Sequence, residues 1–216
     1  MPQRARASDP RRTLLVVSGS QEVPVSETLE RSLGTQAHSL ASTRLATPYV
    51  DPIADPLQRT VRSALESVPI VADLLRGQWL GHPLHAAASD VPVGAWITAV
   101  TLDALAAVSG VKQLRVGADA AVGIGLAGTA VVIASGFADW SAVEDPQAKR
   151  LGFVHGVLNL GVTALMAGSL FCRLTSRRRA GVTLSAAGVA LASLTAWIGG
   201  EMAFGRGVGL RARVVA

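Results

Sequence analysis

The segment that decides the fold comprises residues 120–138, which read AAVGIGLAGTAVVIASGFA. This run contains no Asp, Glu, Lys or Arg. At about 1.5 Å rise per residue, a helix of this length spans roughly 28 Å, close to the thickness of a bilayer's hydrocarbon core. Lipid offers the backbone no hydrogen bonds, so each peptide group must be paired within the segment. The run therefore predicts a membrane-spanning helix.

Three further apolar runs of similar length lie at Val91–Ser109, Leu151–Cys172 and Gly181–Gly200. We expect four spans at about 86–109, 118–138, 151–172 and 180–200. The connections between them are short, so consecutive helices are expected to be antiparallel. The sequence thus predicts an all-α fold whose residues 79–210 form a four-helix transmembrane bundle. Gly-x-x-x-Gly spacing, as in Gly152 and Gly156, predicts close helix packing.

The composition agrees with a membrane protein. Only 16% of the 216 residues are charged, whereas soluble domains contain about 25%. The single cysteine, Cys172, excludes a disulfide framework and a thiolate metal cluster. The net charge of +5 does not indicate nucleic-acid binding, because its densest cluster, at Arg173 and Arg177–Arg179, has no interleaved aromatic residues. It lies between two apolar runs, where basic residues are expected at lipid head groups.

The region before the spans has two parts. Residues 1–54 are rich in Ser, Thr, Arg and Pro and are expected to form a mostly disordered tail. Asp55-Pro56 is a helix-start signal, and apolar residues then recur at helical spacing. Residues 55–78 are therefore predicted to form an amphipathic helix at the membrane interface, with a kink at Pro69.

Polar side chains are concentrated at one end of the predicted bundle. Antiparallel topology places the start of the first and third spans beside the end of the second and fourth. We expect a polar mouth there, formed by His82, His85, Asp90, Asp139, Trp140, His155, Asn159 and Glu201. Ser89 and Asp103 extend this polarity into the membrane, since His85 and Asp103 are five helical turns apart and share one face. The opposite mouth is expected to carry mostly Lys and Arg.

These residues resemble a known family. The stretches GHPLH and SDVPVGAW, then GFADW, the His155–Asn159 segment and a closing GGE, are similar to the bacterial predicted membrane proteins grouped as domain of unknown function 2231. The resemblance covers about residues 55–210 and implies a multi-pass protein of the bacterial plasma membrane. Some relatives carry a fused Rieske or cytochrome-like domain, which implies a redox setting. This chain has neither the Cys and His pairs of a Rieske centre nor a CxxCH motif.

Three functions are consistent with the sequence. The first is an anchor or accessory subunit of a membrane system, such as a redox system, whose partners are the bilayer and a redox protein or a second copy. The second is a haem b protein in which His85 and His155, or His82 in substitution, ligate one iron. The third is a divalent-metal or proton-handling site formed by the mouth residues. A nucleophile elbow and a Cys–His pair are missing, so hydrolytic enzymes of those types are not predicted.

Overall fold

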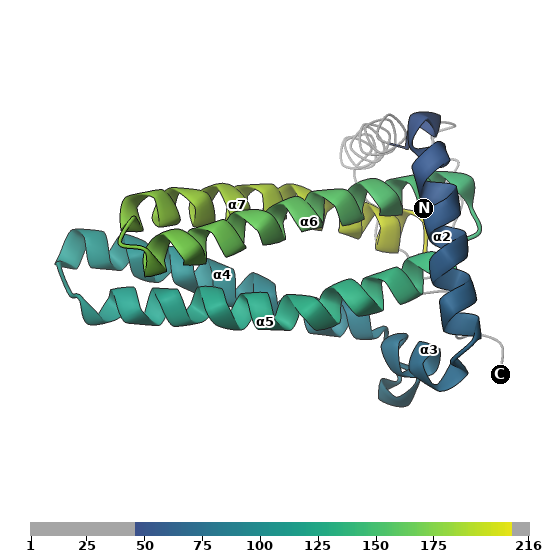
Figure 1. Cartoon of the computed structure of the whole chain (residues 1–216), viewed down its shortest axis with the longest axis horizontal. Coiled ribbons are helices and arrows are strands. Elements are labelled where there is room, and N and C mark those ends of the chain that lie inside the picture. The colour runs from purple at the N-terminus through teal and green to yellow at the C-terminus, as the bar shows by residue number, and fades with distance from the viewer. Residues whose placement is uncertain (1–45, 209–216) are drawn as a thin grey trace, which may run out of the picture. The chain divides into compact units, whose positions relative to one another are not determined.

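The computed structural model describes residues 46–208, and within them it contains helices and no strands. Four of the described helices are long and apolar enough to cross a membrane, as predicted. They are α4 (Leu84–Ser109), α5 (Gln113–Ser141), α6 (Pro146–Leu174) and α7 (Arg178–Gly200), and α7 continues into a π-helical turn, η3 (Glu201–Gly205) (Figure 1). Most of the predicted tail, residues 1–45, lies outside the described residues.

Short connections between the spanning helices make each pair antiparallel. Gly110 ends α4 with a left-handed backbone, φ 72°, that a residue without a side chain adopts at no steric cost. Asp145 caps α6 by accepting a hydrogen bond from the Ala148 backbone amide at 2.7 Å, and Pro146 follows in the first turn. These local signals fix where each helix ends and the next begins.

The bundle consists of two helical hairpins. Helices α4 and α5 pack against each other, as do α6 and α7, and the hairpins meet through α5–α6 and α4–α7 contacts. An apolar layer formed by Trp96, Val162 and Met166 lies in the interior between the two ends of the bundle. Met166 also contacts the site of Gly188 on α7. This layer divides the polar interior into two separate parts.

Some glycines allow this close packing, whereas others, including one that was predicted to do so, have no close neighbour. The Trp96 indole lies directly on Gly125, where a methyl group would overlap it, and Gly152 lies against Trp140. Gly123 and Gly156, by contrast, have nothing near the position that a side chain would occupy. The expected Gly152–Gly156 packing pair is therefore wrong for Gly156, because that residue is on the exposed face of α6.

The contrast between Gly125 and Gly123 gives a matched test of interior packing. We expect Gly125→Ala to lower the free energy of unfolding by about 1–3 kcal/mol, since the Trp96 ring has to move. Gly123→Ala on the same helix should be neutral or stabilising by up to about 1 kcal/mol. Denaturant unfolding in mixed micelles measures both. Equal stability of the two variants would contradict the packing described here.

The region before the bundle is helical from an earlier residue than expected. Helix α2 (Asp51–Glu66) begins at Asp51, four residues before the predicted start, because Asp51-Pro52 repeats the same start signal as Asp55-Pro56. The predicted kink is a break: α2 ends at Glu66 and α3 (Pro69–Leu75) begins at Pro69. A 3₁₀ turn, η1 (Pro48–Val50), precedes α2, and another, η2 (Gln78–Leu80), leads into α4.

Helix α2 lies across the end of the bundle at which α5 ends and α6 begins (Figure 1). Its Gln58 side chain donates hydrogen bonds to the carbonyls of Trp140 and Val143, at 3.0 and 2.9 Å. Arg62 donates to the Ser141 carbonyl at 2.8 Å. These carbonyls lie in the last turn of α5 and just after it, where a helix leaves carbonyls without full intrahelical pairing, although the Trp140 carbonyl also accepts from the Val143 amide at 3.1 Å. Helix α2 therefore caps α5, in addition to any contact with lipid.

Two ion pairs also hold α2 against α6. Arg150 donates to both carboxylate oxygens of Asp51, at 2.6 and 2.8 Å, and Lys149 pairs with Asp55. The hydrogen bonds from Arg150 lower the pKa of Asp51 below its ordinary value. Because the pKa of Asp51 is lower when α2 is docked, docking is stabilised at pH values above the ordinary Asp pKa, which is about 4. This stabilisation is lost as the pH falls through the lowered pKa of the docked state.

We accordingly expect acid to loosen α2. A nitroxide at Ser63→Cys, in a Cys172→Ser background, should be immobile at neutral pH and should gain mobility below about pH 4. Asp51→Asn should raise its mobility at neutral pH and weaken the acid transition. The same mobility and the same transition in Asp51→Asn would show that this pair does not hold α2.

Candidate functional site

His85 and His155 face each other between the two hairpins. His85 lies in the first turn of α4 and His155 lies in α6, and both side chains are half-buried. Their ring centres are 6.4 Å apart, and the ring planes cross at 76°. The structure thus brings together the two histidines that the topology predicted to be neighbours.

The His85 ring is fixed by a backbone carbonyl of the neighbouring helix. Its Nδ1 lies 2.9 Å from the carbonyl oxygen of Val132 on α5. A carbonyl oxygen only accepts, so Nδ1 carries the hydrogen and the Nε2 of a neutral ring has a free lone pair. Ser89 donates to the His85 carbonyl at 2.6 Å, one turn along α4. This is the arrangement in which histidines usually bind metals, with the second nitrogen held by a carbonyl.

His155 is held by Asn159 and Thr195. Asn159 donates through Nδ2 to the His155 carbonyl and to Nε2 of the ring, both at 3.0 Å. Its Oδ1 accepts from the Thr195 hydroxyl on α7 at 3.1 Å. The remaining ring nitrogen, Nδ1, is buried and has no hydrogen-bond partner among the described residues. A buried polar atom without a partner costs about 1–3 kcal/mol, so this nitrogen is a position at which a bound group would be stabilising.

Each ring also lies against a glycine of the second helix in its own hairpin. A methyl group on Gly136 of α5 would lie 2.8 Å from Nδ1 of His85. One on Gly199 of α7 would lie 3.2 Å from Cε1 of His155. The two hairpins therefore repeat one design, a histidine early in the first helix and a glycine late in the second. The sequence alone did not predict either glycine as a neighbour of the rings.

Only part of the predicted mouth lies at the histidines: Asn159 bonds to the His155 ring, and Asp139 is close enough to His85 for their charges to interact. His82 is exposed in the turn before α4, and Asp90 is exposed on the outer face of α4. Trp140 is buried, and its indole donates to the Lys149 carbonyl at 2.9 Å. Asp139 ends α5 half-buried, and Glu201 begins the η3 turn. Within residues 46–208, no three His, Cys, Asp or Glu side chains are grouped as metal ligands.

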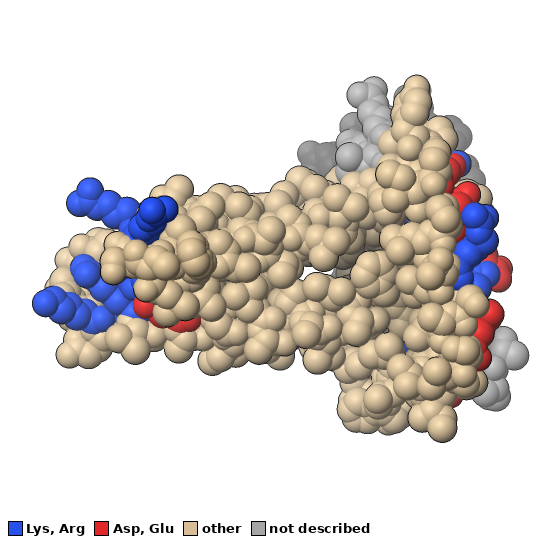
Figure 2. Space-filling model, viewed as in Figure 1, with Lys and Arg blue, Asp and Glu red and all other residues tan. Residues whose placement is uncertain are grey.

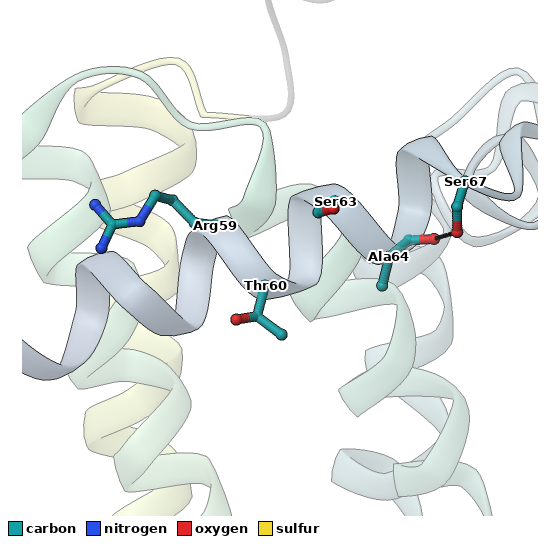
Figure 3. A pocket seen from close by; sticks show the side chains of 5 residues that line it. All are labelled: Arg59, Thr60, Ser63, Ala64 and Ser67. Carbon is teal, nitrogen blue, oxygen red and sulfur yellow. Dashed lines mark hydrogen bonds between the residues drawn. The ribbon is translucent and has the colours of Figure 1, made fainter.

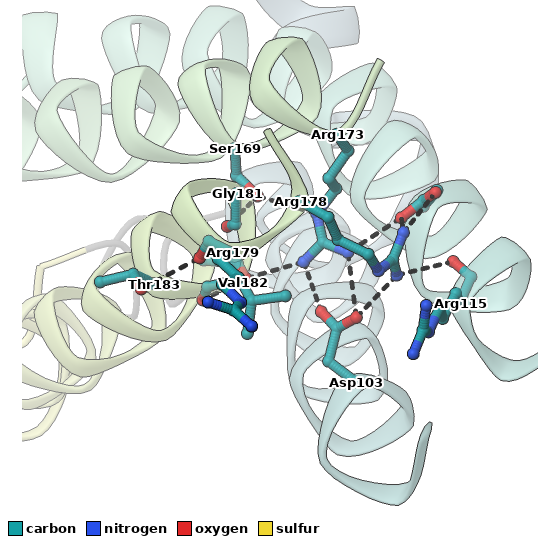
Figure 4. Close-up of polar contacts among 11 residues, drawn as sticks. Asp103, Arg115, Ser169, Arg173, Arg178, Arg179, Gly181, Val182 and Thr183 are labelled. Atoms are coloured by element: carbon teal, nitrogen blue, oxygen red, sulfur yellow. Dashed lines mark hydrogen bonds and ion pairs between the residues drawn. The ribbon is translucent and has the colours of Figure 1, made fainter. Parts of the chain in front are cut away.

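The opposite end of the bundle holds a group of four charges, two of them buried and two partly exposed, which we call the ion cluster: Asp103, Asp119, Arg173 and Arg178 (Figure 4). Hairpin α4–α5 supplies both acids and hairpin α6–α7 supplies both arginines. The side chains of Arg173 and Asp103 are 0% and 3% exposed. This corrects two expectations, because Arg173 turns inward rather than to lipid head groups and this mouth is not merely basic.

Arg173 is fully satisfied within the ion cluster. Its Nε donates to Ser169 at 3.0 Å, and its two terminal nitrogens donate to Asp103, Asp119 and Ser185. Arg178 donates to both oxygens of Asp119 at 2.9 Å and to Asp103 at 2.8 Å. No donor of Arg173 remains for a ligand, so the ion cluster joins the hairpins rather than forming a binding site. Asp119 was not among the predicted polar residues.

A family model now identifies the chain's relatives. Residues 81–212, more than half of the chain, match the model of a predicted membrane protein, DUF2231. The chain belongs to this family. No curated protein and no solved structure matches it significantly.

The part that matches the DUF2231 family contains all four spanning helices, both facing histidines and the ion cluster. Helices α2 and α3 precede it. An open hollow on the surface of α2 is lined by Arg59, Thr60, Ser63, Ala64 and Ser67 (Figure 3). It lies outside the matched region, and none of the predicted site residues lines it. The pair of histidines is therefore the candidate functional site.

Proposed function

We propose that His85 and His155 bind one haem b as its two axial ligands, and that the protein is an electron-transfer subunit of a membrane system. The observation that carries this proposal is the facing pair of rings. Two imidazoles on opposite sides of one metal ion, each bound at about 2 Å, have ring centres roughly 6 Å apart. The rings of His85 and His155 are 6.4 Å apart.

The number of available ligands favours haem over a bare divalent ion. A zinc site needs three or four protein ligands, and iron or copper sites are similar. The described residues offer this position two histidines and no third His, Cys, Asp or Glu. A porphyrin brings four nitrogens of its own, so two axial histidines complete the coordination of its iron. The metal-site alternative has correspondingly less support.

The hydrogen bonds of the two rings fit this role. Each ring has one nitrogen that is held by the protein, at Val132 for His85 and at Asn159 for His155. Neither Nε2 of His85 nor Nδ1 of His155 makes a hydrogen bond within the described part of the chain. Coordination through Nδ1 of His155 would place the proton on Nε2 and would require the Asn159 amide to turn over, so that Oδ1 rather than Nδ2 faces that proton.

Glycines at positions 136 and 199 let the two histidine rings lie directly against α5 and α7. In the space-filling view, an opening lies between the hairpins in the half of the bundle nearer α2 (Figure 2). The haem would be held without a covalent bond, since the single cysteine cannot supply a CxxCH attachment.

A haem with two axial histidines supplies one-electron transfer, because its iron keeps no open position for a substrate. His85 is in the first turn of α4, so the haem would lie near the membrane surface on the α2 side. The Trp96, Val162 and Met166 layer separates this position from the opposite end. Electrons would therefore enter and leave on the α2 side, in exchange with a redox partner at the bacterial plasma membrane.

The haem content of the purified protein tests this proposal. Protein from cells supplied with haem precursor should contain about one haem per chain by pyridine haemochrome assay, with little bound zinc or copper. Stoichiometric zinc or copper without haem would favour the divalent-metal alternative. A protein free of both haem and metal would overturn the proposal and leave a plain membrane anchor.

A further inference from the structure

The end of the bundle remote from α2 exposes four basic residues beyond those in the ion cluster. We call these the basic end: Lys112, Arg115, Arg177 and Arg179. No hydrogen bond or ion pair reaches their charged groups within the described residues, in contrast to Arg173 and Arg178. Arg115 and Arg179 flank the ion cluster, and only their backbone carbonyls accept hydrogen bonds (Figure 4).

The ion cluster leaves the charge of the basic end uncompensated. Asp103 and Asp119 are the acids of this end, and both are engaged by Arg173 and Arg178. The four remaining positive charges gather over the two loops that join the helices of each hairpin (Figure 2). These loops follow the last apolar turns of α4 and α6, which places the charges at the depth of lipid head groups.

Two of these cations occupy an unfavourable position unless an anion is present. Lys112 is the residue before α5 and Arg177 is the residue before α7, and neither helix has a side-chain cap. The first turn of each helix also lacks an acid. The N-terminus of a helix carries partial positive charge and attracts anions. Without a counter-charge, the side chains of Lys112 and Arg177 and the N-termini of α5 and α7 would repel one another. An anion bound at this end would therefore be stabilising.

We propose that the basic end binds the phosphate groups of anionic phospholipids. A basic residue close to an anionic membrane surface strengthens binding roughly fivefold, so four residues together distinguish anionic from zwitterionic lipid strongly. The lipid tails would lie along the exposed apolar residues of the adjoining turns, Val108, Val116, Phe171 and Leu174. This site is separate from the histidine pair and does not depend on haem binding.

The test uses the full-length protein in a neutral detergent, with phosphatidylglycerol or phosphatidylcholine added at increasing concentration and bound lipid counted by native mass spectrometry. We expect phosphatidylglycerol to bind more tightly than phosphatidylcholine. Arg177→Gln should weaken phosphatidylglycerol binding roughly fivefold, and replacing all four cations by Gln should remove the preference. Arg59→Gln is the matched control, an exposed arginine on α2 at the opposite end, and should change nothing.

Three results would overturn the proposal. The first is equal binding of the two lipids by the native protein. The second is a preference that survives in the fourfold variant while that variant keeps its melting temperature. The third is displacement of phosphatidylglycerol by an equal concentration of inorganic phosphate, which would make this a site for a free anion. If the fourfold variant does not fold, Lys112→Gln with Arg115→Gln and Arg177→Gln with Arg179→Gln give the same comparison in two halves.

Discussion

Protein carrying His85→Ala or His155→Ala will be purified from membranes in normal amount but without haem. Each substitution removes one of the two ligands that we propose, and the described residues offer no third histidine at this position. The loss should exceed tenfold in haem per chain, since even changes outside the ligand set cost metal sites 10–100-fold. The α and β bands of the reduced spectrum measure the remaining low-spin haem.

His82→Ala is the control for this experiment. His82 is three residues before His85 but is exposed in the turn that precedes α4, so its removal should leave the haem content unchanged. Loss of haem in His82→Ala with full retention in His85→Ala would show that His82, and not His85, is the ligand. Full retention in His85→Ala and His155→Ala together would refute the shared site.

Asp103→Ala will be the most destabilising substitution of a polar residue in the bundle. It leaves Arg173, whose side chain is 0% exposed, with Asp119 as its remaining acid. Removing one partner of a buried ion pair costs about 3–5 kcal/mol, because the other charge stays buried. Unfolding in mixed micelles gives this free energy directly.

Asp90→Ala is the matched control, since Asp90 is on the same helix but exposed, and its replacement should change stability by less than about 0.5 kcal/mol. Asp103→Leu combined with Arg173→Met should recover most of the loss, because the pair Asp119 and Arg178 remains neutral. An Asp103→Ala protein as stable as Asp90→Ala would show that the ion cluster does not join the hairpins.

Most of the fold could be predicted because hydropathy and length decide it. A run such as residues 120–138 has no alternative to a helix in lipid, so four spanning helices were predicted, and the structure has four helices long and apolar enough to cross a membrane. The first residue of α2 could not be chosen from the sequence, because two Asp-Pro pairs, at 51–52 and 55–56, give the same helix-start signal. The role of α2 as a cap for α5 was not predictable, because it depends on tertiary contacts from Gln58 and Arg62.

The candidate site was predictable in part for a geometric reason. Antiparallel topology places His85 and His155 at similar depth, and the structure has them face to face. Topology does not determine which way a side chain turns, so His82 and Asp90 were included although they are exposed. For the same reason Arg173 was assigned to the lipid surface, although Asp103 and Asp119 at the same depth were a signal for inward pairing.

Electron paramagnetic resonance of the oxidised protein tests whether His85 and His155 ligate the haem iron. Two histidines give low-spin ferric haem, and the steep 76° angle between the rings predicts the strongly anisotropic signal of crossed imidazole planes. That signal should disappear in His85→Ala and in His155→Ala and persist in His82→Ala. A high-spin signal in the native protein, or a low-spin signal that survives both substitutions, would contradict ligation by this pair.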